Sequence, residues 1–456
     1  MSLQRVLVAN RGEIAVRVIK ACKALGIESV VTVSKADSDS AAARLADRAV
    51  CIGPAKVGES YLNQNAILAA ALGTKADAIH PGYGFLAENP RFVRACEKEG
   101  ITFIGPKSSS VEMMGNKLAA RELAEKCGVP VVPGSPHVSS YEDAAKIAGE
   151  IGFPLLFKAA AGGGGRGIRI VNKTDELKDA FQNASREAEA AFGDNTLYME
   201  RYVTSARHIE IQVFGDSFGD VIHLGERDCS MQRRYQKIIE EAQAVMVPES
   251  TREKIRVSAV ALVKGISYEN AGTVEFIYDE ERDEFYFLEM NTRIQVEHPV
   301  TEAVTGIDLV QLQLKVAGGE AIPYAQSDIA FTGHAIECRI NAESPQRSFH
   351  PSPGRITTWR PPEMEGLRLD THCYEGYLVP PFYDSLLGKM IVYGKDRSEA
   401  LKKTRIALES FEVKGIETNI GFLSFLANEP DFESGRYNTR WVEQNIGRFL
   451  PPQGQG

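Results

Sequence analysis

Apolar positions near the start of the chain alternate between strand-like runs and an amphipathic helix pattern. The run RVLVAN precedes a segment that places five apolar residues on one helical face, and SVVTVS follows it; the five are Ile14, Val18, Ala21, Cys22 and Leu25. This order predicts a βαβ unit. Apolar runs at residues 78–79 and 101–104, each after a helical pattern, extend the unit into an open parallel sheet.

The pattern changes twice further along. Residues 128–140 read GVPVVPGSPHVSS, and the Pro, Gly and Ser positions indicate a connection between subdomains. From Phe331 onward, short segments are broken by HPSPGRI and RPPEMEG before a helical finish that starts near residue 398. We therefore expect an α/β and α+β chain with four segments: domains at residues 1–113, 114–330 and 331–446, with a mobile lid at about 131–203, and a tail at 447–456.

Composition narrows the function. The chain has 456 residues, 43% hydrophobic and 25% charged, which is ordinary for a globular protein, and its net charge of −9 argues against non-specific nucleic-acid binding. Neither a signal peptide nor an apolar run of about 20 residues is visible, so we expect a cytoplasmic protein with no membrane partner. The seven cysteines are scattered without a C-x-x-C pair, which favours reduced packing residues over a zinc site or disulfides.

A glycine-rich loop provides the first candidate chemistry. Residues 162–167, GGGGRG, match G-x-G-x-x-G after an apolar run at residues 155–157. A dinucleotide fold needs a helix next, whereas Ile168, Ile170 and Val171 continue as a strand. The loop is therefore predicted to be the tip of a β-hairpin, where glycine lets backbone N–H groups approach phosphate and the tip can close as a lid. A flexible turn without a ligand is the alternative.

Two lysines accompany this loop. Lys158 lies in the apolar run PLLFKAAA, and a buried ammonium needs an anion, which nucleotide phosphates would supply. Lys117 opens the helical segment GNKLAARELAEKCGVP, and taken alone it fits a solvated surface charge equally well.

Two carboxylates are expected to face one another. Glu275 and Glu289 lie in the strand-like runs GTVEFIY and EFYFLEMN, so a hairpin centred near Arg282 would set them opposite each other. Like charges in that position are destabilising unless a cation is shared. Mg²⁺ bridging to nucleotide phosphates would satisfy both, and a neighbouring Arg or Lys is the alternative.

Polar residues recur at alternate positions after Glu289. In an extended chain Asn291, Arg293, Gln295 and Glu297 would point the same way, with Arg293 gripping a small oxyanion and Glu297 acquiring a raised proton affinity suited to a general base. A solvated edge strand would explain the same pattern. A basic cluster with Arg233, Arg234 and Lys237 is either a wet surface or, if Lys237 converges on Arg293, part of the anion site.

Eight stretches together resemble the biotin carboxylase branch of the ATP-grasp superfamily: HPGYGFLAEN, KAAAGGGGRG, RHIEIQV, ERDCSMQRRYQK, EMNTRIQVEHPVTE, HAIECRINAE, FIGP and PSPGRI. The resemblance runs from ANRGEIAVRVI near the start to GIETNI near the end. It implies a Rossmann-like parallel N-terminal domain, a central ATP-grasp domain with a glycine-rich lid, and a C-terminal biotin carboxylase α+β domain.

The resemblance also implies roles for individual residues. ATP would contact Lys117, Lys158, Gly163, Gly164, Gly165, Gly167, Glu200, His208, Gln232, Glu275 and Glu289. Mg²⁺ or Mn²⁺ would bind Glu275, Glu289 and Asn291; bicarbonate would bind Lys237, Arg293, Gln295, Val296 and Glu297; biotin would bind Tyr83 and Arg339.

The chemistry implied is carboxylation of biotin. The catalytic set would be Glu297, Arg293, Arg339 and Lys237: Glu297 deprotonates bicarbonate, which attacks the γ-phosphate to give carboxyphosphate. That intermediate yields CO₂ and phosphate, the phosphate takes the biotin N1 proton, and Arg339 stabilises the enolate. Tyr235, Gln243 and Ile168 depart from the usual family pattern, but none carries a proposed charge, so we expect activity to be retained.

No AMKM-type biotin acceptor is visible, so biotin is expected on a biotin carboxyl carrier protein, and a separate carboxyltransferase subunit is expected with it. A homodimer is expected from the family, and acetyl-CoA carboxylase is the expected parent enzyme, with another acyl-CoA or a 2-oxo acid as open alternatives for the acceptor. Two other functions compete: an ATP-grasp ligase joining a carboxylate to an amine, and a nucleotide-binding regulatory subunit that has lost catalysis.

Overall fold

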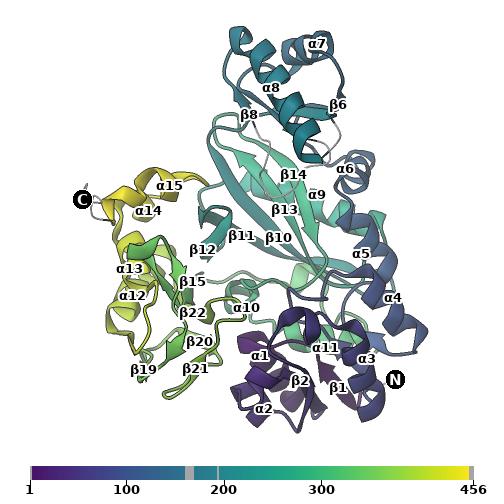
Figure 1. The fold of residues 1–456 in the computed structure, drawn as a ribbon, viewed down its shortest axis with the longest axis vertical. Helices are drawn as coiled ribbons and strands as arrows, with labels where there is room; N and C mark the ends of the chain where they lie inside the picture. Colours follow the sequence, from purple (N-terminus) through teal and green to yellow (C-terminus); the bar gives the residue numbers. More distant parts are fainter. Residues whose placement is uncertain (1–2, 160–168, 193–194, 451–456) are drawn as a thin grey trace.

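The computed structural model describes residues 3–159, 169–192 and 195–450 (Figure 1). The predicted ATP-binding glycines Gly163, Gly164, Gly165 and Gly167, and the departure Ile168, lie outside these residues. Among the described helices none is long and apolar enough to cross a bilayer. All seven cysteines are free thiols.

The N-terminal sheet is parallel, with the strand order β3-β2-β1-β4-β5. Its strands are β1 (Arg5–Val8), β2 (Glu28–Ser34), β3 (Arg48–Gly53), β4 (Ala78–His80) and β5 (Thr102–Phe103). The helices that follow them are α1 (Gly12–Ala24), α2 (Ala41–Leu45), α3 (Gln64–Thr74), α4 (Pro90–Lys98) and α5 (Ser108–Gly115). Val6 and Val8 pack into one core and Leu7 into another, so both faces of the sheet are covered. The predicted parallel sheet is confirmed.

A second sheet has the order β14-β13-β10-β11-β12-β15-β22-β20. Its strands are β10 (Ala206–Gly215), β11 (Val221–Arg233), β12 (Gln236–Ala242), β13 (Asn270–Asp279), β14 (Glu284–Asn291), β15 (His334–Asn341), β20 (Leu367–Thr371) and β22 (Leu386–Gly394). Antiparallel pairing of β12 with β15 carries the sheet from the central segment into the C-terminal one. The sequence indicates a separate region after Phe331, whereas backbone hydrogen bonds make the two segments share one sheet.

Helices cover this long sheet in different places. They are α6 (Lys117–Lys126), α9 (Glu249–Gly265), α10 (His298–Thr305), α11 (Leu309–Ala317), α12 (Arg397–Ser410), α13 (Ile420–Asn428), α14 (Pro430–Glu433) and α15 (Trp441–Asn445). Ile255 and Leu262 of α9 pack with Ile211 and Phe276, while Leu401 and Leu423 share a core with β15 and β22. Short paired strands complete the C-terminal segment: β16 (Glu343–Ser344), β17 (His350–Pro351), β18 (Gly354–Arg355), β19 (Thr358–Arg360), β21 (Leu378–Val379) and β23 (Glu412–Lys414).

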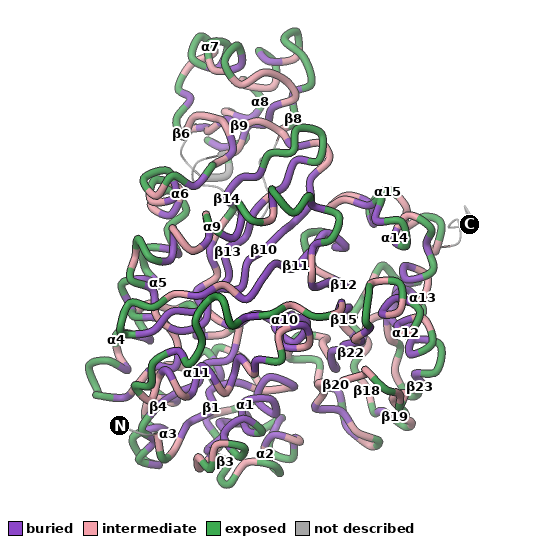
Figure 2. Tube along the Cα trace, turned by 180° about the vertical axis from the view of Figure 1, so that it is seen from behind, coloured by how far each residue is buried: buried purple, intermediate pink, exposed green. Residues whose placement is uncertain are grey.

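A smaller unit projects beyond the main sheet (Figure 1). It contains the sheet β6-β9-β7-β8 and two helices: β6 (Gly134–Val138), α7 (Tyr141–Ile151), β7 (Leu155–Ala159), β8 (Arg169–Val171), α8 (Thr174–Phe192) and β9 (Leu197–Arg201). It has its own apolar core, which includes Phe157, Leu177 and Met199. Strands β7 and β8 pair antiparallel, as the predicted glycine-tipped hairpin requires. Figure 2 shows that the outer surface of α7 and α8 is largely exposed.

The N-terminal domain is fixed to the rest of the chain by ion pairs centred on the buried side chains of Arg17 and Glu302. Arg17 of α1 contacts Glu302 of α10 at 2.8 Å and Asp308, the N-cap of α11, at 2.6 Å. The Glu302 carboxylate also contacts Arg368 of β20 at 2.7 Å. Removing one member of such a pair would leave a buried charge without its partner. These contacts therefore fix the positions of α1, the α10–α11 segment and β20 relative to one another.

Candidate functional site

A cleft of about 1370 Å³ opens between the N-terminal domain, the small projecting unit and the long sheet. Every predicted site residue within the described ranges lines it: Tyr83, Lys117, Lys158, Glu200, His208, Gln232, Lys237, Glu275, Glu289, Asn291, Arg293, Gln295, Val296, Glu297 and Arg339. These residues are separated by up to 256 positions in the chain, and the fold brings them to one place. Lys237 and Arg293 therefore converge on the same cleft.

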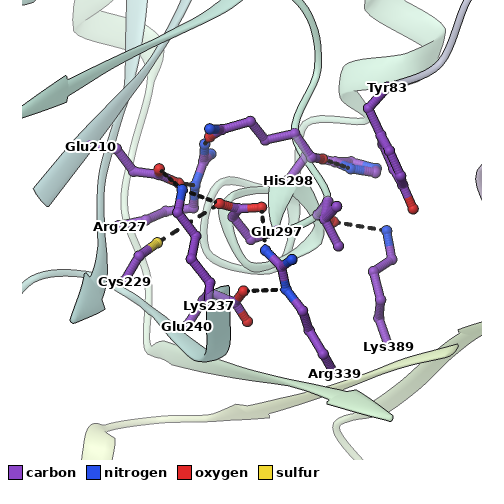
Figure 3. Close-up of polar contacts among 12 residues, drawn as sticks. Tyr83, Glu210, Arg227, Cys229, Lys237, Glu240, Glu297, His298, Arg339 and Lys389 are labelled. Atoms are coloured by element: carbon purple, nitrogen blue, oxygen red, sulfur yellow. Dashed lines mark hydrogen bonds and ion pairs between the residues drawn. The ribbon is translucent and has the colours of Figure 1, made fainter. Parts of the chain in front are cut away.

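The ammonium of Lys237 lies among three carboxylates, and Figure 3 shows two of them, Glu210 and Glu297. Its Nζ donates to Glu210 at 2.6 Å, to Glu297 at 2.6 Å and to Glu275 at 3.1 Å. Only 12% of the side chain is exposed. Burial alone would lower the pKa of Lys237, but the three carboxylates outweigh it and hold the pKa well above its ordinary value. Lys237 is therefore a permanent cation in the floor of the cleft.

A buried arginine supports this cluster from below. Arg227 of β11 has no exposed surface, and its Nε donates to Glu210 at 2.5 Å. Its other nitrogens donate to Gln212, Thr273, Thr301 and Gln295. The sequence reasoning missed Glu210 and the role of Arg227. The pattern that could have revealed them is the alternation of Glu210 and Gln212 along β10, which places two polar side chains on one face of a buried strand.

Glu297 is held by one cation at each oxygen. Lys237 donates to Oε1 at 2.6 Å and Arg339 donates to Oε2 at 2.9 Å (Figure 3). Arg339 is itself held by Glu240 at 2.5 Å, another residue that sequence reasoning missed. Burial raises the pKa of Glu297, but Lys237 and Arg339 bring it below its ordinary value. The side chain is therefore an ionised carboxylate at neutral pH, and the raised proton affinity expected for Glu297 beside an anion stays a prediction.

The polar residues after Glu289 do not form an extended strand. Asn291 ends β14, and Arg293, Gln295 and Glu297 lie in the loop that leads to α10. They still reach the cleft because the loop turns into the helix, with Pro299 at its first turn. The predicted extended geometry is thus wrong.

Each side chain of this loop has a defined partner. Arg293 Nε donates to Glu88 at 2.8 Å, an ion pair the sequence reasoning missed, and Arg293 Nη2 donates to Asn291 at 3.1 Å. Gln295 Nε2 donates to Glu275 at 2.7 Å. In the described part of the chain, the amide N–H groups of Val296 and Glu297 donate no hydrogen bond. Two unused donors at the start of α10, beside Lys237, suit a small anion.

Glu275 and Glu289 are cross-strand partners in the β13–β14 ladder, as predicted. Glu275 accepts from Lys237 and Gln295, and His208 Nε2 lies 3.2 Å from its Oε2. Burial lowers the pKa of His208, but Glu275 prevails and raises it to about 9. For Glu275 the compensating cations are therefore protein side chains, which was the alternative considered from the sequence.

Glu289 differs from its partner. No ion pair to Glu289 occurs among the residues the structure describes, and burial together with the charge of Glu275 raises its pKa. An unpaired carboxylate beside a second one offers the oxygen ligands that Mg²⁺ prefers, so these side chains fit a divalent ion. Among the described residues two groupings of potential ligands occur, His208 with Glu210 and Glu275, and Glu210 with Cys229 and Glu297, and the Lys237 ammonium already contacts two carboxylates in each.

The opposite end of the cleft carries the remaining lysines. Lys158 pairs with Glu200, and its Nζ lies 5.3 Å from the centroid of the Tyr198 ring. Lys117 is the first residue of α6, where Asn116 caps the helix, and its side chain is exposed. Tyr235, one of the departures noted in the sequence, also lines the cleft and is 83% exposed.

The loop that carries Tyr83 is held from beneath. Asn10 Nδ2 donates to the carbonyls of Pro81 and Tyr83, and the N–H of Gly82 donates to Nδ1 of His80 at 3.0 Å. Gly82 has φ of +63° and a Cβ there would meet the Asn10 side chain at 2.9 Å, so the position requires glycine. The Tyr83 hydroxyl donates to Glu13 at the wall of the cleft.

Comparisons with known families and proteins agree with this geometry. Three family profiles match: "Biotin carboxylase, N-terminal domain" at residues 2–111, "Carbamoyl-phosphate synthase L chain, ATP binding domain" at 116–325, and "Biotin carboxylase C-terminal domain" at 337–444. Biotin carboxylase 1 of Bacillus subtilis is 49% identical over 442 residues, covering 97% of this chain and 98% of the relative. A pyruvate carboxylase subunit from Methanothermobacter thermautotrophicus is 50% identical over 441 residues, covering 96% and 89%.

Solved structures give the same result. The biotin carboxylase domain of a thermophilic 2-oxoglutarate carboxylase bound to bicarbonate superposes with a TM-score of 0.94 at 46% identity, covering 99% of this chain and all of that one. The biotin carboxylase from Campylobacter jejuni, in a complex described as β-γ-ATP, gives a TM-score of 0.89 at 48% identity, covering 97% and 99%.

His80, which accepts a hydrogen bond from the Tyr83 loop, is predicted to have an unusually low pKa. Burial lowers the pKa of His80 to about 3, and its Nδ1 can accept from Gly82 only while the ring is neutral. Because the folded pKa lies below the unfolded value of about 6.5, His80 stabilises the fold above pH 6.5, and that contribution declines as the pH falls toward 3. In ¹H–¹⁵N NMR of the imidazole nitrogens, His80 should remain neutral at pH 5. Protonation of His80 near pH 6.5 would contradict this account.

Proposed function

Because the chain belongs to the biotin carboxylase family, we propose that its cleft carries out the first half-reaction of a biotin-dependent carboxylase at the residues described above. The family is one of ATP-dependent carboxylases within the ATP-grasp ligases. In the proposed reaction, ATP, bicarbonate and biotin on a carrier protein give ADP, phosphate and carboxybiotin.

Bicarbonate is proposed to bind where the positive charge and unused donors coincide. Lys237 and Arg293 supply the cations, Gln295 supplies an amide, and the N–H groups of Val296 and Glu297 are unused. A small planar anion can accept hydrogen bonds from all of these donors. Its bonds from Lys237 and Arg293 would be charge-assisted, and such bonds are shorter and stronger than neutral ones. Glu88 and Arg227 hold Arg293 and Gln295 in place through the contacts given above.

The observation that carries the proposal is the Glu297 carboxylate between Lys237 and Arg339. An ionised carboxylate at this point can accept the bicarbonate proton, so that a bicarbonate oxygen attacks the γ-phosphorus and the bond from γ-phosphorus to the leaving ADP oxygen breaks. The carboxyphosphate formed decomposes to CO₂ and phosphate, phosphate accepts the N1 proton of biotin, and N1 then bonds to the carbon of CO₂ to give carboxybiotin. Arg339, the partner of Glu297, is placed to hold the ureido oxygen as it gains negative charge.

The nucleotide is proposed to lie across the rest of the cleft. Its contacts would be Lys117, Lys158, Glu200, His208, Gln232, Glu275, Glu289 and the glycines of the loop, with the unit at about 131–203 acting as a lid over it. Glu275, Glu289 and Asn291 would hold Mg²⁺ or Mn²⁺, which neutralises triphosphate charge when bound. A closed lid keeps water from carboxyphosphate.

The parts of the wider enzyme are also proposals. The name of one solved relative describes a biotin carboxylase domain dimer with MgADP, ADP and bicarbonate, which supports a homodimer here. Biotin would arrive on a biotin carboxyl carrier protein, and a carboxyltransferase would complete the reaction in the cytoplasm. We propose acetyl-CoA as the first acceptor to test, against the 2-oxo acids that the names of two relatives suggest.

Replacing the base should separate chemistry from binding. Glu297→Gln keeps the size of the side chain but cannot accept the bicarbonate proton, so bicarbonate-dependent ADP release should fall by about 10²- to 10⁴-fold while ATP affinity stays within about threefold. The assay follows ADP release with free biotin, with and without bicarbonate, and ATP affinity by calorimetry. Glu343→Gln is a matched control, because Glu343 lines the same cleft but contacts Asn341 and Ser385. Turnover of Glu297→Gln equal to that of the control would exclude Glu297 as the base.

The final carboxyl acceptor can be identified from the carboxyltransferase that binds this chain. Affinity purification from the source cell should recover a biotinylated carrier and a carboxyltransferase with the chain, and the purified complex should transfer ¹⁴C from bicarbonate to acetyl-CoA. Transfer to pyruvate or 2-oxoglutarate, with none to acetyl-CoA, would replace the proposed acceptor and leave the half-reaction unaffected.

A further inference from the structure

A buried lysine behind the cleft is not explained by the functions above. Lys389 lies on β22 directly opposite Arg339 of β15, and its side chain has no exposed surface. Two cations facing each other across a ladder destabilise a sheet, and a buried ammonium is costly unless it is paired. An apolar residue would fill the position at less cost, so the contacts of Lys389 decide what it does.

Lys389 contacts two groups that border the cleft. Its Nζ donates to the carbonyl oxygen of Val296 at 2.8 Å and contacts Glu13 Oε1 of α1 at 3.1 Å. Glu13 and Val296 line the cleft, whereas Lys389 itself does not. In the described chain Glu13 is the ion-pair partner of Lys389. The buried Glu337 nearby does not pair with Lys389, and neither of its carboxylate oxygens has a hydrogen-bond partner.

The same carboxylate receives a second donor. The Tyr83 hydroxyl donates to Glu13 Oε1, the oxygen that Lys389 contacts. The Lys389 ammonium also lies 5.9 Å from the centroid of the Tyr83 ring. A continuous polar path therefore runs from Tyr83 through Glu13 and Lys389 to the backbone of Val296.

Peptide geometry gives this path a consequence. A trans peptide is planar, so the carbonyl of Val296 and the N–H of Glu297 point in opposite directions. Anchoring that carbonyl to Lys389, behind the cleft wall, therefore also fixes the Glu297 N–H, which lies in the same plane and points the opposite way. Within the described residues this N–H has no hydrogen-bond acceptor.

We propose that Lys389 and Glu13 are positioning residues that connect the biotin subsite at Tyr83 to the bicarbonate loop at Val296 and Glu297. This assignment rests on the proposed function. Lys389 sets the peptide that presents its N–H to bicarbonate. Because the Tyr83 hydroxyl and the Lys389 ammonium contact the same oxygen of Glu13, a shift of Tyr83 changes the position of Lys389. Neither residue touches the reacting atoms, so the expected effect is on bicarbonate binding and on its response to biotin.

The first test replaces the ammonium. Lys389→Met removes the charged donor, and the KM for bicarbonate should rise by about tenfold or more, because a hydrogen bond from a charged group contributes about that factor. The KM for ATP should stay within about twofold, a split that general loss of structure would not produce. Lys403→Met is the matched control, since Lys403 of α12 donates to the Tyr393 carbonyl of the same strand β22 but lies outside the cleft lining.

A second variant covers the case in which Lys389→Met does not fold. Glu13→Gln keeps a side chain of the same size and leaves Lys389 able to hold Val296, so the KM for bicarbonate should rise by only about two- to fivefold. An unchanged KM for bicarbonate in both soluble variants, or in Glu13→Gln alone if the other is insoluble, would overturn the assignment.

The link to Tyr83 is tested by a double-mutant cycle. Tyr83→Phe removes only the hydroxyl, and in combination with Lys389→Met, or with Glu13→Gln, its effect on the bicarbonate KM should be smaller than the product of the single effects. Multiplicative effects would overturn the coupling. A wild-type protein without bicarbonate-dependent ADP release would overturn the proposed function and this assignment together, whereas an active wild type with unaffected variants would overturn this assignment alone.

Discussion

The architecture of the cleft depends on the Lys237 ammonium surrounded by Glu210, Glu275 and Glu297. Three buried carboxylates would repel one another, and each would be driven toward its neutral form by burial. One shared cation, supported by Arg227 behind Glu210 and by Arg339 at Glu297, keeps the group ionised. The site therefore holds the proposed base, Glu297, in its charged state beside a permanent cation.

The long sheet explains how this cluster is built. Glu210, Lys237, Glu275 and Arg339 come from β10, β12, β13 and β15, which are held in one sheet by backbone pairing. The loop that carries Glu297 returns over that sheet into α10, and the N-terminal domain closes the other side through Arg17 and Glu302. The positions of the cleft residues and the docking of the N-terminal domain consequently depend on the same backbone, and the projecting unit is the part of the cleft wall with a core of its own.

Local patterns in the sequence predicted much of this structure. The βαβ start, the hairpin around the glycine loop and the facing of Glu275 and Glu289 follow from periodicity and from short connections, and the structure has all three. Long-range pairing could not be predicted from such patterns: Glu88, Glu210 and Glu240 bind cations 17 to 205 positions away, and even where alternation marks a residue, as at Glu210, it does not identify the partner. The expected extended geometry of residues 291–297 was wrong, because the chain leaves the strand at Asn291 and turns into α10 at His298.

The central claim is that bicarbonate is held beside Glu297 so that one of its oxygens attacks the γ-phosphorus of ATP. Oxygen transfer tests this most directly: bicarbonate labelled with ¹⁸O is supplied with ATP and biotin, and the phosphate released is analysed by ³¹P NMR or mass spectrometry. The account predicts one ¹⁸O atom in each phosphate released, because the oxygen that attacks phosphorus stays with it when CO₂ departs. Phosphate without ¹⁸O, formed at the normal bicarbonate-dependent rate, would contradict it.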